Sequence, residues 1–102
     1  MRLSDSRELR GFVLRVCQIN YPHGCSEQLL QITLQENQFM SSPAALKADI
    51  EYLEEKGYVR VEEQNSERLG ISRTIVYCTA KGIDLLERNI PADPGILLPV
   101  VC

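Results

Sequence analysis

The sequence predicts an α+β fold in which helices build the core and a single β-hairpin comes late in the chain. Apolar residues recur at helical spacing in the first half of the chain and again near its end. Two segments rich in β-branched residues follow the third helical pattern, with a polar stretch between them. Capping residues precede the helical patterns, and Gly or Pro follows them. We therefore expect a three-helix core, a two-stranded hairpin and a C-terminal helix, in that order.

The length and composition are those of one folded domain. The chain has 102 residues, of which 44% are hydrophobic and 25% are charged. No apolar run approaches the roughly 18 residues that a membrane span requires. The N-terminus is charged with no apolar segment behind it, unlike a secretory signal. We expect a cytoplasmic protein with one domain over residues 1–90 and an apolar C-terminal tail over residues 91–102.

The first helix is expected over residues 6–20. Its apolar stripe has the spacing of an amphipathic helix and consists of Leu9, Phe12, Val13, Val16, Cys17 and Ile19. Asp5 and Glu8 have the spacing of a capping box at its start. Pro22 and Gly24 then favour a turn.

Two further helices are expected before the hairpin. The second covers residues 26–36, is capped by Ser26, and has an apolar face made of Leu29, Leu30, Thr33 and Leu34. The third is capped by Ser42 and has Pro43 at its first position, where the missing N–H costs nothing. Its buried stripe is Leu46, Ile50 and Leu53. Gly57 follows as a left-handed C-terminal cap.

The second half of the chain predicts a hairpin and a last helix. Strands are expected over residues 58–62 and 71–78, joined by a charged segment. Thr79 can cap a helix over residues 80–89, in which Gly82 allows close backbone packing. We expect this last helix to pack against helix one. The residues that we expect to be buried are Phe12, Val16, Leu30, Leu34, Leu46, Ile50, Leu53, Val59, Val76, Ile83 and Leu86.

The charge of the chain is acidic overall but unevenly distributed. The net charge is −3 and the pI is about 5.1, which counts against nucleic-acid binding as a global average. Residues 25–56 carry two lysines against six acidic residues, whereas residues 1–24 carry four arginines against two. Basic character therefore lies near the N-terminus and in segment 68–73.

The four cysteines favour free thiols in a reducing compartment. They form no Cys-x-x-Cys pair, and Cys17 and Cys78 fall within apolar patterns that indicate core positions. His23 and Cys25 form a lone His-x-Cys, too few ligands for a zinc site. No phosphate-binding loop, acid pair or nucleophile motif stands out, so we expect neither a cofactor nor an enzyme.

Two local motifs resemble a winged helix-turn-helix domain. Leu46-x3-Ile50-x2-Leu53-x3-Gly57-Tyr58-Val59 resembles the end of a recognition helix and the first wing strand of MarR-, PadR- and ArsR-like regulators. Thr74-Ile75-Val76-Tyr77-Cys78-Thr79-Ala80-Lys81-Gly82 resembles the second wing strand and the "Tyr-x-Leu-Thr-x-x-Gly" entry to the last helix, with Cys78 in place of Leu. The resemblance covers roughly residues 8–90. The small size also resembles short regulators encoded by prophages.

The resemblance implies a sequence-specific DNA-binding transcriptional regulator that acts as a homodimer on double-stranded DNA. In the family, the start of the third helix faces bases in the major groove and the wing contacts flanking DNA. Carried over by position, the contacts are Ser41, Ser42, Ala45 and Lys47, with Arg68 and Arg73 on the wing. We expect the acidic run Asp49, Glu51, Glu54 and Glu55 to lie away from the groove. Arg7 and Arg10 are further candidates for phosphate contact.

A winged-helix module that binds another protein, without DNA, is the alternative. Its partner would dock on the acidic third helix or on the apolar tail, and the acidic pI favours this interpretation. Residues 96–101 of the tail can pack on their own domain or on a second copy. We place the expected dimer contact on helix one, helix four and this tail.

Overall fold

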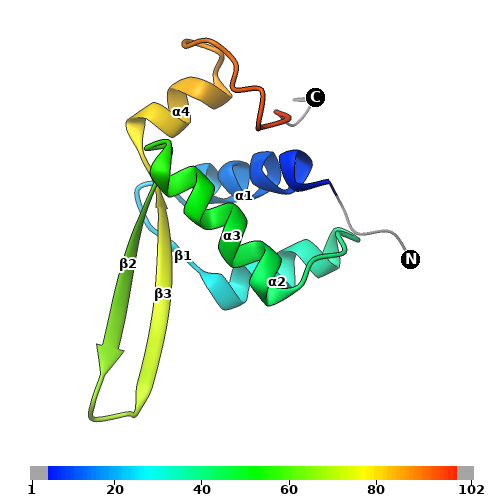
Figure 1. Ribbon diagram of the computed structural model, residues 1–102. Helices are drawn as coiled ribbons and strands as arrows, with labels where there is room; N and C mark the ends of the chain where they lie inside the picture. The colour runs from blue at the N-terminus through cyan, green and yellow to red at the C-terminus, as the bar shows by residue number, and fades with distance from the viewer. Residues whose placement is uncertain (1–4, 99–102) are drawn as a thin grey trace.

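A computed structural model describes residues 5–98 of the chain (Figure 1). Seven elements follow one another: α1 (Ser6–Asn20), β1 (Cys25–Ser26), α2 (Glu27–Glu36), α3 (Pro43–Glu55), β2 (Val59–Ser66), β3 (Ile71–Cys78) and α4 (Ala80–Leu86). The three first helices form one body, from which the β2–β3 hairpin projects, and α4 lies at the opposite end from the hairpin tip (Figure 1). The predicted α+β class and the order of the helices and hairpin are confirmed.

Local side-chain chemistry sets where each helix begins. In every helix the predicted capping side chain accepts a hydrogen bond from a backbone N–H of the first turn, and the caps are Asp5, Ser26, Ser42 and Thr79. Pro43 occupies the first turn of α3 as predicted. Gly57 ends that helix with a φ of +82°, the left-handed region that favours glycine.

The hairpin is longer than its hydrophobic pattern predicts. β2 continues to Ser66 and pairs with β3 residue by residue, so only residues 67–70 form the tip. The predicted strand ended at residue 62, where the apolar alternation stops. Pairing continues beyond that point because the two strands satisfy each other's backbone groups without needing a buried face.

A short strand that the sequence analysis missed completes the sheet. β1 pairs with β3, with Cys25 opposite Val76 and Ser26 opposite Ile75, and the strand order is β1-β3-β2. Two residues are too few for a period-2 pattern to show in the sequence. Cys25 is buried at this junction, so β1 attaches the helices to the base of the hairpin.

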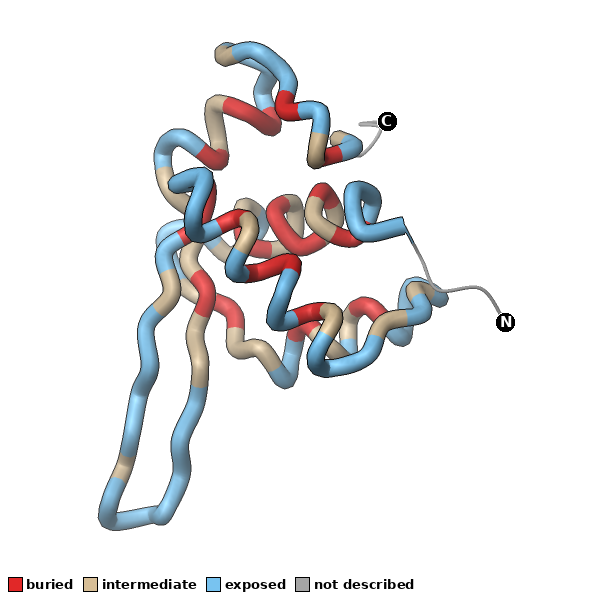
Figure 2. The backbone as a smooth tube through the Cα atoms, viewed as in Figure 1, coloured by how far each residue is buried: buried red, intermediate tan, exposed pale blue. Residues whose placement is uncertain are grey.

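The core lies between the helices and the base of the sheet, while the outer half of the hairpin is exposed (Figure 2). Most of the predicted core residues are buried, namely Leu30, Leu34, Leu46, Ile50, Leu53, Val59, Val76 and Leu86, and the predicted core cysteines Cys17 and Cys78 are buried too. Phe12, Val16 and Ile83 pack against this core but are only half-buried. The predictions for Ile19 and Leu29 were wrong: both side chains are exposed, because they lie at the margins of their stripes.

The last helix packs against α1 as predicted, but it is shorter. α4 contacts α1. At Gly82 it also approaches the start of β2, where an added Cβ would collide with the carbonyl oxygen of Tyr58, so glycine is required there. α4 ends at Leu86 rather than at residue 89, and Arg88 has a left-handed φ of 60°. Within residues 5–98, no helix has the length and apolar character of a membrane span.

The segment after α4 folds back over α1. Ile96 is buried in the core, and the N–H of Leu97 donates to the carbonyl of Arg7 at 3.0 Å. Of the two arrangements open for the apolar tail, its described part packs on its own domain. Residues 99–102, including Cys102 and the end of the predicted tail, lie outside the described residues.

Candidate nucleic-acid interface

The start of α3 presents small side chains and one lysine to solvent. Ser42, Pro43, Ala44 and Lys47 are exposed, Ala45 is half-buried and Leu46 is buried in the core. The Ser42 hydroxyl accepts the N–H of Ala45 at 3.1 Å, and the Ser41 hydroxyl donates to the carbonyl of Ser42 at 3.2 Å. Both predicted serine contacts are therefore already engaged in shaping the helix start.

Lys47 borders a hollow between α3 and the hairpin. The hollow has a volume of about 190 Å³. Its other lining residues are mostly acidic or apolar: Glu27, Glu51, Glu54, Glu63, Ile50, Val61 and Thr74. Glu51 and Glu54, which we expected to lie away from the DNA groove, share this hollow with Lys47, because successive turns of a helix place the three residues on one face.

Asp49, from the same acidic run, has a different environment and does lie away from the hollow, as expected. This carboxylate is 2% exposed and accepts a hydrogen bond from the Nε of Arg10 at 3.1 Å, so it faces α1 rather than solvent. Arg10 also lies over the ring of Tyr52, 3.9 Å from the ring centroid. Arg7 is paired with Asp5 at 2.9 Å. Neither arginine is free for a phosphate.

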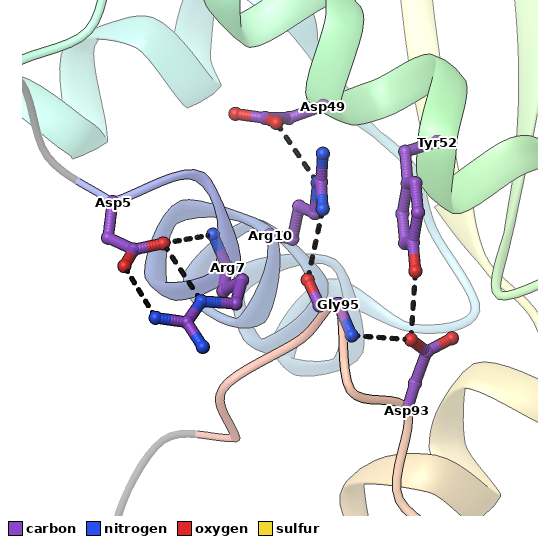
Figure 3. A network of polar contacts seen from close by, with 7 residues as sticks. All are labelled: Asp5, Arg7, Arg10, Asp49, Tyr52, Asp93 and Gly95. Atoms are coloured by element: carbon purple, nitrogen blue, oxygen red, sulfur yellow. Dashed lines mark hydrogen bonds and ion pairs between the residues drawn. The ribbon is translucent and has the colours of Figure 1, made fainter.

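A polar network holds the C-terminal segment on α1 and α3 (Figure 3). Arg10 donates to the carbonyl of Gly95 at 3.1 Å, and the N–H of Gly95 donates to Asp93 at 2.8 Å. The hydroxyls of Tyr52 and Tyr58 donate to the two oxygens of Asp93 at 2.8 and 3.0 Å. The network serves structure, since every charge in it has an internal partner.

The pKa values of this network follow from burial and hydrogen bonding. Burial raises the pKa of Asp49, against the opposing effect of Arg10. Burial also acts to raise the pKa of Asp93, but the donors from Gly95 and the two tyrosines outweigh it and leave that pKa lowered. Burial and the bond to Asp93 raise the pKa of Tyr58 to about 12.

The two arginines predicted on the hairpin are both exposed. Arg68 lies in the tip, and Arg73 lies on β3. Side chains alternate across a strand, so Arg73 and its neighbour Thr74 face opposite sides of the hairpin. Thr74 borders the acidic hollow with Lys47, whereas Arg73 borders a separate hollow of about 360 Å³ near the tip. Lys47 and Arg73 therefore do not share one patch.

The three cations predicted to contact DNA lack the ion pairs that several other arginines form. Among residues 5–98, Lys47, Arg68 and Arg73 form no ion pair and no contact with an aromatic face. The ion-paired arginines of this range are Arg7, Arg10 and Arg60. The predicted contact cations are thus available to an external anion.

The thiols belong to the core rather than to a reactive site. Cys17, Cys25 and Cys78 are buried and form no disulfide, and burial raises the pKa of each thiol. In the described part of the chain, no group of three or more His, Cys, Asp or Glu side chains is arranged to hold a metal ion. The exposed His23 stands in the turn before β1.

Comparison with solved structures shows which fold this arrangement represents. A PadR-like transcription factor from Bacteroides fragilis superposes with a TM-score of 0.62 at 15% identity, over 76% of this chain and 75% of that chain. A PadR family transcription regulator from a hypervirulent Clostridium difficile superposes with the same TM-score at 17% identity, over 76% and 80% of the two chains.

The fold is a winged helix. In this fold the β2–β3 hairpin is the wing, and α3 is the helix that directly precedes it. At this level of identity the likeness shows the fold alone. No family model matches the sequence, and no curated protein matches it.

Proposed function

We propose that this winged helix is a DNA-binding transcriptional regulator that contacts double-stranded DNA with the start of α3 and with the wing. The observation that carries the proposal is the exposure of Lys47, Arg68 and Arg73 without internal ion pairs. An exposed cation without a partner can neutralise a phosphate at little cost, whereas a paired one must first give up its carboxylate. The similar fold of two transcription regulators supports the same function.

The start of α3 suits close approach to a nucleic-acid backbone. Its first-turn N–H groups and the positive end of its dipole favour an anion, and the small Ala44 and Ala48 side chains leave room for it. Ser41, Ser42 and Ala45 contribute mainly by shaping this helix start. Lys47 is the cation best placed to reach a phosphate or a base edge from α3.

The acidic hollow beside Lys47 limits what one copy can achieve. Glu51 and Glu54 repel phosphates at the same helix face that presents the lysine. Two copies on two half-sites would add their contacts through effective concentration. We therefore propose a homodimer, with α1, α4 and the segment around the exposed Leu97 at the interface.

Titration of duplex DNA with wild type and alanine variants tests DNA binding. Lys47→Ala, Arg68→Ala and Arg73→Ala should each weaken binding to random duplex, measured by fluorescence anisotropy. Each should also make binding less sensitive to salt: the negative slope of log K against log salt should become shallower by about 0.9. Arg88→Ala, which removes an exposed arginine just after α4, is the matched control and should leave the slope unchanged. Equal binding by wild type and the triple variant would overturn the proposal and favour the alternative of a protein-binding module.

Light scattering on the full chain tests the dimer. Wild type should have the mass of two copies, and Leu97→Lys should shift the mass toward one copy. This substitution is a cleaner test than truncation, because removing residues from Gly95 onward would also delete the buried Ile96. A monomeric wild type would rule out the dimer, and a dimeric Leu97→Lys variant would remove the C-terminal segment from the interface.

A further inference from the structure

One edge of the wing is unpaired beside an exposed apolar surface of α2. β1 ends at Ser26, opposite Ile75, and the chain then turns into α2. Residues 71–74 of β3 pair with β2 on one side, but on the other side no strand of the described residues covers them. Along an antiparallel strand, every second residue points both its N–H and its C=O to the same edge. This stretch therefore has free backbone donors and acceptors in line with β1.

A hollow lies directly along this unpaired edge. Its volume is about 340 Å³, and it is lined by Ser26, Gln28, Leu29, Ile32, Ile71, Ser72 and Arg73. It shares Ile71 and Arg73 with the hollow of about 360 Å³ near the wing tip. The two hollows are thus neighbours, and together they form a continuous surface along β3.

Exposed aliphatic side chains are concentrated on this surface. Leu29 and Ile32 of α2 are 48% and 51% exposed, and Ile71 and Leu69 of the wing are 43% and 70% exposed. An exposed apolar patch with polar residues around it is typical of a protein-interaction site. Natural sheets usually protect a free edge with charges, Pro or a bulge, whereas the hollow along this edge is lined by three aliphatic side chains and a single arginine.

We propose that an extended peptide segment of a partner protein, with alternating apolar and acidic side chains, binds here as a fourth strand of the sheet. Its backbone continues the line of β1 and pairs with residues 71–74. Its apolar side chains enter the hollow over Leu29 and Ile32, and a carboxylate meets Arg73.

Charge complementarity selects the acidic partner. Within residues 5–98, Arg73 is exposed, has no ion pair, and is the only charged residue that lines either of the two hollows. The hollow beside Lys47 on the other side of the wing is instead lined by four glutamates. A peptide with carboxylates is therefore attracted to the α2 side and repelled from the α3 side, whereas a basic peptide would favour the α3 side. Arg73 is also a proposed DNA contact, so a peptide carboxylate and a phosphate would compete for it, but the strand pairing itself does not depend on DNA binding.

Selection from a displayed library of random peptides tests the proposal. Each peptide has about ten residues, which is long enough to pair with the whole edge. Peptides enriched on the wild-type chain should alternate apolar and acidic residues. On Arg73→Glu the acidic positions should change to Lys or Arg. Enrichment of basic or helical motifs on wild type, or no enrichment at all, would overturn the proposal.

NMR spectra of the protein with a selected peptide, and the affinity of that peptide for protein variants, then locate the peptide's binding site. Residues 71–74, Leu29 and Ile32 should shift in NMR spectra, and Ile32→Gln should weaken binding by about tenfold because it removes apolar contact area. Ile19→Gln, at a more exposed isoleucine near the end of α1, should bind as wild type does. A copy of the peptide N-methylated at alternate residues should lose binding, since it cannot pair with a strand edge.

Two results would contradict this arrangement. Undiminished binding by the N-methylated peptide would show that side chains alone are recognised and that no strand is added. Concentration-dependent shifts of residues 71–74 without any peptide, together with a dimer that Ile32→Gln dissociates, would show that a second copy covers the edge instead.

Discussion

The two ends of this molecule use charged residues in opposite ways. At the α4 end, Arg10, Asp49 and Asp93 are at least partly buried, and each has internal partners. At the wing end, Lys47, Arg68 and Arg73 are exposed and unpaired in the described chain. Internal partners make a charge part of the fold, and their absence leaves a charge for an external ligand. The comparison predicts that substitutions at the first end change stability, while those at the second change binding.

Removal of Arg10 should have the largest effect. Arg10→Ala leaves the carboxylate of Asp49 buried without its cation and frees the carbonyl of Gly95. We expect the free energy of unfolding to fall by about 3 kcal/mol, the usual cost of breaking one side of a buried pair. Urea denaturation measures it. Arg68→Ala at the wing tip is the control and should stay within about 0.5 kcal/mol of wild type. Equal effects of the two substitutions would contradict the comparison.

Substitution of Asp93 should have the next largest effect and should depend on pH. Asp93→Asn weakens three hydrogen bonds, so we expect a loss of about 1–2 kcal/mol at neutral pH. The pKa of Asp93 is lowered in the folded state. The stability that its carboxylate contributes is therefore present above the unfolded pKa near 3.8 and is lost as the pH falls through the lower folded value.

Thermal unfolding between neutral pH and pH values below that range measures this dependence. The difference between wild type and Asp93→Asn should narrow as the pH falls. Asp84→Asn, the same substitution at an aspartate of α4 outside this hydrogen-bond network, is the control. A difference that is constant with pH would show that ionisation of Asp93 does not contribute to stability.

Neutralising a glutamate beside Lys47 should have a smaller effect, and on binding rather than stability. Glu54→Gln removes one negative charge from the hollow between α3 and the wing. We expect duplex DNA to bind about threefold tighter at low salt, and the gain to disappear at high salt. Anisotropy titrations measure it. Glu87→Gln after α4 is the control, and an equal gain there would indicate a general charge effect.

The smallest effect on stability is expected at the wing tip. Leu69 is 70% exposed, so Leu69→Ser removes almost no buried area and should change the free energy of unfolding by less than about 0.5 kcal/mol. Denaturant unfolding checks this. A loss comparable to that of Asp93→Asn would show that the tip packs on the domain, contrary to the exposure of its side chains.

The sequence by itself determined the helices, their boundaries at the N-terminal side, and most of the core. A cap acts on an N–H within three residues, and an apolar stripe follows from the helical repeat, so both are local and readable. Ser42 with Pro43 and Thr79 with Gly82 are examples in which a few adjacent residues decide the structure. The winged-helix fold followed from these local signals through their order and the resemblance of two motifs.

Only the tertiary structure decided which charges are internal and which surfaces are open. Asp49 and Glu51 look alike in the sequence, yet one is buried against Arg10 and the other borders the hollow with Lys47. Their difference depends on α1, because the partner of Asp49 is Arg10, which lies 39 residues away along the chain. The short strand β1, the free edge of β3 and the exposure of Leu29 likewise depend on which distant segments pack together. Local pattern cannot encode them, because the partner that buries or exposes a residue is supplied by a remote part of the chain.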